Sequence, residues 1–182
     1  MAQKRKDPLS PSQRGFVTRW GEMGRAWGLP RSAAQIHGLL LAADAPMTAE
    51  EISDALSIAR SNVSTSLKEL RALGVIRGAS GIGDRAERFA ALDDPWEAAR
   101  RIAAARKARE FDPAALALRE AADAADGDAA ARLSAYADLS EAVGGWTEDM
   151  NRLPGGALKS ILSAGAGIVD AITPKKKKKK KA

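Results

Sequence analysis

Apolar residues in the first half of the chain recur every three or four positions, which is the spacing of one face of an α-helix. This pattern predicts helices at residues 11–27, 32–43, 49–56 and 60–73. Glycine and proline end helices, and they separate these segments at residues 28–30, 45–47 and 74. The first helix carries an apolar stripe of Phe16, Trp20, Met23 and Trp27, and the fourth turns inward Val63, Leu67 and Leu70.

Two short β-leaning segments follow, at 75–77 and roughly 85–92, joined by the glycine-rich stretch 78–84. A glycine-rich link between two such segments predicts a β-hairpin. Asp94 and Pro95 then start a long helix, with Glu97 three residues after the capping Asp94, as in a capping box. Alanine-rich helices occupy the rest of the chain, at about 95–109, 113–125, 128–143 and 157–172.

The order of these elements is that of a winged helix-turn-helix: two short helices joined by a tight turn, then a hairpin. Thr48 and Glu51 have the spacing of a capping box at the start of the first of the two helices. We therefore predict a mainly α fold, a winged helix-turn-helix with a small β-hairpin wing plus a C-terminal helical dimerisation region. The expected parts are a flexible basic arm (1–10), an N-terminal helix and winged DNA-binding domain (11–94), a linker helix and dimerisation region (95–156), an amphipathic helix (157–173) and a disordered lysine tail (174–182).

The outward face of the helix at 60–73 carries side chains that suit a DNA groove. Arginine and asparagine pair with guanine and adenine edges, hydroxyl groups bind bases or phosphate, and lysine binds phosphate. The candidate DNA-binding residues of this helix are Arg60, Ser61, Asn62, Ser64, Thr65 and Lys68. In the wing, the candidates for phosphate or minor-groove contact are Arg77, Arg85 and Arg88, with ordinary solvated arginine as the alternative. Some winged helices only dock other proteins, so DNA binding is the favoured of two interpretations.

Three segments resemble the GbsR-type branch of the MarR regulators: Met47–Ile76, Gly83–Phe89 and Asp94–Glu97. The resemblance covers about residues 12–150 and implies a cytoplasmic, homodimeric, DNA-binding transcription regulator, in a branch known for a response to choline. Two positions depart from the branch: Ser57 replaces a turn glycine, and Ala59 stands where a serine commonly caps the recognition helix. A missing cap costs about 1 kcal/mol, so neither departure breaks the motif.

Composition removes several classes of function. The chain has no cysteine and one histidine, His37, which leaves no basis for disulfides, thiol chemistry or a transition-metal site. No nucleophile–base pair or phosphate-binding glycine loop is present, so we expect no enzyme activity, no cofactor and no metal. No apolar signal core follows the basic N-terminus, and we expect a cytoplasmic protein.

The scarce aromatic residues invite two interpretations. Trp20, Trp27 and Trp96 are candidates for binding a small-molecule effector, because aromatic faces attract a quaternary ammonium. Packing between the N-terminal helix and the dimer helices is the favoured alternative. His37 lies on an apolar helix, and we expect it in the core or an interface rather than as a ligand.

The positive charge is concentrated at the C-terminus, where the seven lysines of 175–181 exceed the whole net charge of +6. Such a run is suited to hold the protein on DNA or to contact an anionic membrane. The segment before it, 157–172, has one apolar helical face, which is also typical of a peripheral membrane anchor, although it is too short and too charged to span a bilayer. We rank a DNA tether or a solvated tail above membrane contact.

Together these features predict a homodimeric, sequence-specific, repressor-like transcription regulator that binds double-stranded DNA at a palindromic operator. Its dimer interface is expected in the helix at 12–27 and the helices after Pro95. The alternative is a non-catalytic interaction protein tethered to anionic membrane by its C-terminal helix and lysine tail.

Overall fold

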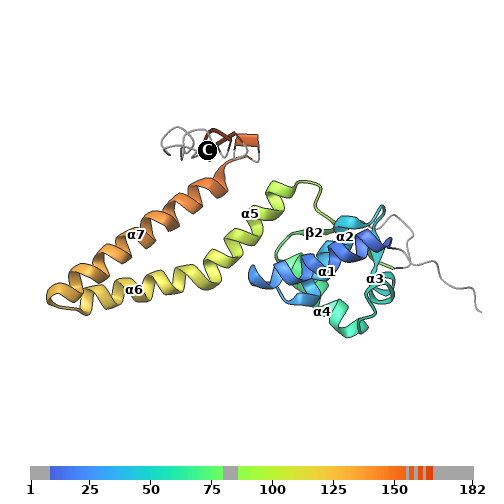
Figure 1. Ribbon diagram of the computed structural model, residues 1–182, viewed down its shortest axis with the longest axis horizontal. Helices are drawn as coiled ribbons and strands as arrows, with labels where there is room; N and C mark the ends of the chain where they lie inside the picture. The colour runs from blue at the N-terminus through green and yellow to red at the C-terminus, as the bar shows by residue number, and fades with distance from the viewer. Residues whose placement is uncertain (1–8, 80–85, 155, 158–159, 162, 166–182) are drawn as a thin grey trace, which may run out of the picture. The chain divides into compact units, whose positions relative to one another are not determined.

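A computed structural model of the chain describes residues 9–79, 86–154, 156–157, 160–161 and 163–165. The first elements are α1 (Pro11–Ala26), α2 (Arg31–Ala42), β1 (Met47–Thr48), α3 (Ala49–Leu56), α4 (Arg60–Ala72), β2 (Ile76–Gly78) and β3 (Arg88–Ala91). The remaining helices are α5 (Pro95–Arg106), the π-helical segment η1 (Lys107–Phe111), α6 (Asp112–Ala124) and α7 (Gly127–Arg152) (Figure 1). The chain forms two compact units, residues 1–116 and 117–182, and each is described by itself.

Helix α1 begins at a capping box in which Ser10 accepts from the Gln13 amide and Gln13 accepts from the Ser10 amide. Its buried residues are Val17, Gly21 and Gly24. A Cβ at Gly24 would overlap the Ala34 Cβ, so the glycine face lets α1 lie close against α2. The predicted stripe of α1 is therefore not its buried face, and Phe16, Met23 and Trp27 are exposed.

The core of the first unit lies between α2, α3, α4 and the small sheet. Its fully buried members include Ile36, Leu39, Ile52, Val63 and Leu70, and each side chain of this kind stabilises the fold by about 1.5–3 kcal/mol. The predicted inward face of α4 is confirmed, since Val63, Leu67 and Leu70 are all buried.

The sheet has the strand order β1–β3–β2 and is antiparallel throughout. The wing hairpin is confirmed, with Ile76 opposite Ala91 and Gly78 opposite Phe89. The third strand was not predicted: Met47 and Thr48 pair with Phe89 and Arg88. This strand is made by partners some 40 residues away, so its own sequence gives no sign of it.

The helices after Pro95 differ from the prediction at two places. No break separates α5 from α6, because η1 carries the helix on to Asp112, whose N–H donates to the Lys107 carbonyl. This hydrogen bond spans five residues instead of the four of an α-helix, so the bonding pattern shifts by one residue just before Pro113, which has no N–H to donate. Helix α7 also runs past Gly144 and Gly145 to Arg152, where an end near residue 143 was expected.

In the second unit, the chain turns back after α6 into α7 (Figure 1). Charge-assisted hydrogen bonds and small buried residues join the two helices. Arg119 donates to Glu141 (2.7 Å) and Asp138 (2.6 Å), and Ala122 and Ala137 are buried. These bonds, above all that to Glu141, raise the pKa of Arg119. Another face of α7 is exposed and apolar: Tyr136, Leu139, Val143 and Trp146 are 44–66% exposed.

Part of the expected architecture lies outside the described residues. This holds for Arg85, for most of the amphipathic segment 157–173 and for the lysines 175–181. Among the described residues, no helix is long and apolar enough to cross a membrane.

Candidate nucleic-acid interface

The outer face of α4 is polar and exposed. Of the residues predicted to read DNA, the structure places the following on this surface: Arg60, Ser61, Asn62, Ser64, Thr65 and Lys68. Ala59 gives α4 no side-chain cap, so the N–H groups of its first turn keep their capacity to bind an anion. A helix N-terminus of this kind is suited to an anion such as a phosphate.

The turn between α3 and α4 holds the two helices at a defined angle. Ser57 has φ 54, the left-handed conformation that ends α3, and this explains why a glycine is common at the position. The Ser53 hydroxyl donates to the Ile58 carbonyl (2.7 Å), and the Ile58 amide donates to the Ser53 carbonyl (3.2 Å). Thr48 and Glu51 form the predicted capping box at the other end of α3.

Arg60 is paired within the helix-turn-helix. Its Nη2 lies 2.7 Å from Glu50 Oε1 on α3, although its side chain is 72% exposed. An exposed pair of this kind contributes about 0–1 kcal/mol, so a base or phosphate can replace the carboxylate at little cost. Sequence reasoning missed this partner because the two residues lie on different helices.

Asn62 is connected to the core by a short chain of hydroxyl groups. The buried Ser66 hydroxyl lies 3.4 Å from Asn62 Oδ1 and 3.0 Å from the Ser32 hydroxyl at the start of α2. Thr65 donates to the Ser61 carbonyl (3.1 Å). The buried Ser66 thus ties the exposed Asn62 amide to α2, a link that periodicity did not indicate.

The described arginines of the wing are each matched with a carboxylate. Arg77 lies 3.3 Å from Asp93 at the exposed surface. Arg88 donates to the Pro46 carbonyl (2.8 Å) and lies 3.2 Å from Glu51, so its guanidinium joins β3 to the start of α3. The described part of the wing therefore offers cations at particular positions, each beside a carboxylate, and phosphate affinity depends on where each cation lies.

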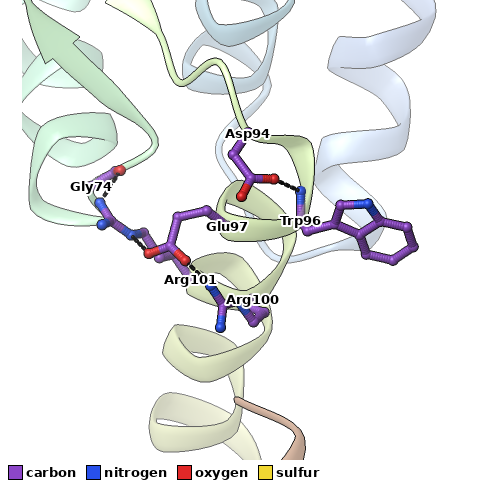
Figure 2. A network of polar contacts seen from close by, with 6 residues as sticks. All are labelled: Gly74, Asp94, Trp96, Glu97, Arg100 and Arg101. Atoms are coloured by element: carbon purple, nitrogen blue, oxygen red, sulfur yellow. Dashed lines mark hydrogen bonds and ion pairs between the residues drawn. The ribbon is translucent and has the colours of Figure 1, made fainter. Parts of the chain in front are cut away.

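The three tryptophans proposed for an effector are not assembled into one cage. Trp20 is half-buried against Phe16 (ring centroids 5.3 Å apart) and His37 (5.9 Å). Trp27 is exposed at the end of α1, and the Trp96 ring points away from the polar network of α5 (Figure 2). Of the hollows at the surface of the described first unit, one of about 1410 Å³ lies beside α3 and a smaller one lies along α1, and these tryptophans line neither of the two.

His37 is buried at 3% exposure, and its Nδ1 accepts a hydrogen bond from Trp20 Nε1 (3.3 Å). Burial lowers the pKa of His37 from 6.5 to about 4, so the ring is neutral at physiological pH. The expectation of a core residue is confirmed. Among the described residues, no group of three His, Cys, Asp or Glu side chains is arranged to hold a metal ion.

A network of polar contacts in the first half of α5 reaches Gly74, just after the end of α4 (Figure 2). Asp94 caps α5 by accepting from the Trp96 amide (2.8 Å). Glu97 does not complete the expected capping box, because its carboxylate binds the Arg101 Nε (2.7 Å) and Arg100. The Arg101 hydrogen bond is the main reason that the pKa of Glu97 is lowered. Arg101 also donates to the Gly74 carbonyl (2.5 Å).

Residues 39–77 match a protein-family model described as bacterial regulatory protein, arsR family. The crystal structure of a transcriptional regulator is similar to 78% of this chain and 96% of its own length, with 27% identity and a TM-score of 0.61. A transcriptional regulator from Thermotoga maritima has 18% identity and a TM-score of 0.38, over 76% of this chain and 90% of its own. A MarR family transcription regulator has 20% identity and a TM-score of 0.36, over 79% and 88%. No curated protein matches the chain in sequence.

The family match spans the end of α2, all of α3 and α4 and the start of β2. The chain therefore has the winged helix-turn-helix fold of DNA-binding transcription regulators.

Proposed function

We propose that this protein is a transcription regulator that binds double-stranded DNA as a homodimer and reads a roughly palindromic operator. The observation that carries the proposal is the outer face of α4, where groove-suited side chains are exposed over a buried inner face. A two-fold dimer then places two copies of residues 60–68 in major grooves about one helical turn apart. The similarity to a transcriptional regulator of known structure supports the same function.

The residues divide into three roles. Arg60 and Asn62 at the start of α4 contact base edges, while Lys68 and the hydroxyl side chains of Ser61, Ser64 and Thr65 contact bases or phosphates. In the wing, Arg77 and Arg85 contact the backbone or the minor groove. The bonds of Arg88 to Pro46 and Glu51 favour a role in holding the base of the wing in place.

Two exposed apolar surfaces support the homodimer. On α7 the apolar residues Tyr136, Leu139, Val143 and Trp146 are spaced three, four and three apart, which is the repeat of a helix that packs against another helix. On α1, Phe16, Met23 and Trp27 are exposed. We therefore assign DNA binding to residues 11–94 and linkage and dimerisation to 95–156, with α1 adding to the dimer interface. Membership of the GbsR branch and control by a small molecule belong to the same proposal.

A repressor of this kind acts in the cytoplasm by occupying its operator, and we propose no catalytic role. The test is selection of bound duplexes from a random pool with the full chain, followed by footprinting. We expect a two-fold symmetric motif. Asn62→Ala should relax the base preference at one position in each half of the motif. The control Thr18→Ala, which removes an exposed hydroxyl of α1, should leave the motif unchanged. Failure of the full chain to enrich any motif would contradict the proposal.

A further inference from the structure

The linker helix formed by α5 and η1 contacts the rest of the first unit through few apolar residues. Of its side chains only Ala98 and Ile102 are buried. Three of its polar contacts with the winged domain follow a common pattern, in which an arginine guanidinium donates to a backbone carbonyl at the C-terminal end of a helix. Arg101 binds the Gly74 carbonyl (2.5 Å), Arg106 that of Ala26 (2.9 Å) and Arg109 that of Gly28 (3.0 Å).

Two of these carbonyls belong to glycines that end helices in the same way. Gly28 follows α1 with φ 80, and Gly74 follows α4 with φ 69. In each case the next amide donates back to the helix, Leu29 to Gly24 and Val75 to Leu70, which is the Schellman pattern. The last carbonyls of a helix carry partial negative charge, so a guanidinium is favoured at this place.

The missing side chains of both glycines make room for the arginines. A Cβ at Gly28 would lie 2.8 Å from Arg109 Nη2. A Cβ at Gly74 would overlap the Arg101 guanidinium. The left-handed backbone favours glycine at both positions, and any side chain there would push the arginine away from the carbonyl that it binds.

Carboxylates of the linker helix hold the arginines in these directions. Glu97 binds Arg101 (2.7 Å), as Figure 2 shows. Glu110 binds Arg106 (3.1 Å) and Arg109 (3.3 Å). Each arginine thus bridges a carboxylate of its own helix and a carbonyl of the winged domain. We call Arg101, Arg106 and Arg109 the arginine clamp.

The clamp attaches the linker helix at two separate points. Arg101 reaches the end of α4, and Arg106 reaches the end of α1 five residues later, about 8 Å further along a helix. One attachment leaves a helix free to pivot, whereas two attachments fix its direction. The clamp side chains are 43–56% exposed, and exposed contacts of this kind add little to global stability. What these contacts fix is the direction of the linker helix relative to the winged domain.

We propose that the arginine clamp is a positioning device in which Arg101 sets the angle between the recognition helix α4 and the linker helix. This inference rests on the proposed function, because the linker helix leads from the DNA-binding domain to the dimerisation region. The angle of α4 then determines which half-site spacing the dimer accepts. Arg101 contacts no DNA and acts through the backbone of Gly74.

The first test compares the operator selected by the wild-type chain with duplexes whose half-sites lie one or two base pairs nearer or further apart. We expect the wild type to prefer its own spacing by about tenfold or more, equivalent to about 1.4 kcal/mol. Arg101→Ala should lower the affinity for duplexes with that spacing and leave the affinity for the other spacings unchanged, so that the preference is lost. Arg101→Lys, which keeps the charge but lacks the planar fork, should restore part of it.

The control is Arg19→Ala, which removes one exposed positive charge of α1 outside the clamp. It should change the affinity for duplexes of every half-site spacing by the same factor. A merely stabilising role for Arg101 would likewise lower all affinities together. An unchanged spacing preference in a folded Arg101→Ala protein, checked by thermal unfolding, would therefore overturn the proposal.

A second measurement tests the clamp without DNA. The chain has no cysteine, so Ser61→Cys on α4 and Ala108→Cys on η1 accept two spin labels, with labelled chains diluted into unlabelled ones. The distance distribution should be narrow in the wild-type background, broader with Arg101→Ala and unchanged with Arg19→Ala. An equally narrow distribution in all three refutes the clamp. Failure to select an operator refutes DNA binding instead, so the two proposals fail separately.

Discussion

Acidification should destabilise the first unit through one residue, His37. Its ring lies between α1 and α2, where Nδ1 accepts a hydrogen bond from Trp20 Nε1 (3.3 Å). The proton of the neutral ring is therefore assigned to Nε2, which is buried without a hydrogen-bond partner among the described residues. A second proton on the ring would remove the acceptor for Trp20 and place an unpaired charge in the core.

The size of the effect follows from the pKa. Burial lowers the pKa of His37 from 6.5 to about 4, and each pKa unit corresponds to about 1.4 kcal/mol. Below the unfolded value of 6.5 the unfolded chain binds a proton that the folded chain does not, so stability falls as the pH drops. The loss from this group should reach about 3 kcal/mol near pH 4 and grow no further below it.

Urea unfolding followed by far-UV circular dichroism measures this loss in wild type and in His37→Gln. Glutamine does not titrate, and its side-chain oxygen keeps an acceptor for Trp20. Other acidic groups affect both proteins equally, so the difference in unfolding free energy between the two isolates His37. That difference should shift in favour of the variant between about pH 6.5 and about pH 4. A difference that stays constant over this range would show that His37 is not held neutral by burial.

Three further predictions concern the proposed regulator. Arg60→Ala should relax the base preference at one operator position at a cost of about 1–3 kcal/mol of binding free energy, whereas Lys68→Ala should weaken binding to all DNA sequences alike. Equal base-preference profiles for the two variants in a binding-site selection would contradict these roles. Val143→Lys on the exposed face of α7 should shift the dimer toward monomer in analytical ultracentrifugation, and an unaltered dimer would place the interface elsewhere. Deleting residues 175–181 should lower the affinity for operator DNA and for random DNA by similar factors, and should make that affinity less dependent on salt. A changed operator preference would contradict a tether, and tail-dependent binding to anionic but not neutral vesicles would favour membrane contact.

Local signals in the sequence located the elements of the winged domain well. Proline, glycine and capping residues place the ends of α1 to α4 within one or two positions of those observed. The capping box of Thr48 and Glu51 and the uncapped start at Ala59 were both predictable. Such signals act within one helical turn, so they need no knowledge of the rest of the fold.

Other features of the helices depended on what packs against them. The apolar stripe of α1 indicated a helix correctly but not its buried face, because two glycines decide how closely α1 approaches α2. The stretch around Pro113 looked like a helix end, and the π-helical turn before it keeps the helix continuous. Periodicity alone does not distinguish an inward apolar face from one left for a partner.

The candidate site shows the same division. The sequence by itself determined which side of α4 faces outward, because the 3.6-residue period is a property of the helix alone. Only the tertiary structure decided the partners: Glu50 for Arg60, Ser66 for Asn62, and the Gly74 carbonyl for Arg101. The longest of the polar links of the linker helix join residues 80 and 81 positions apart. Those pairings exist because particular helix ends meet in space, and no local pattern records which ends will meet.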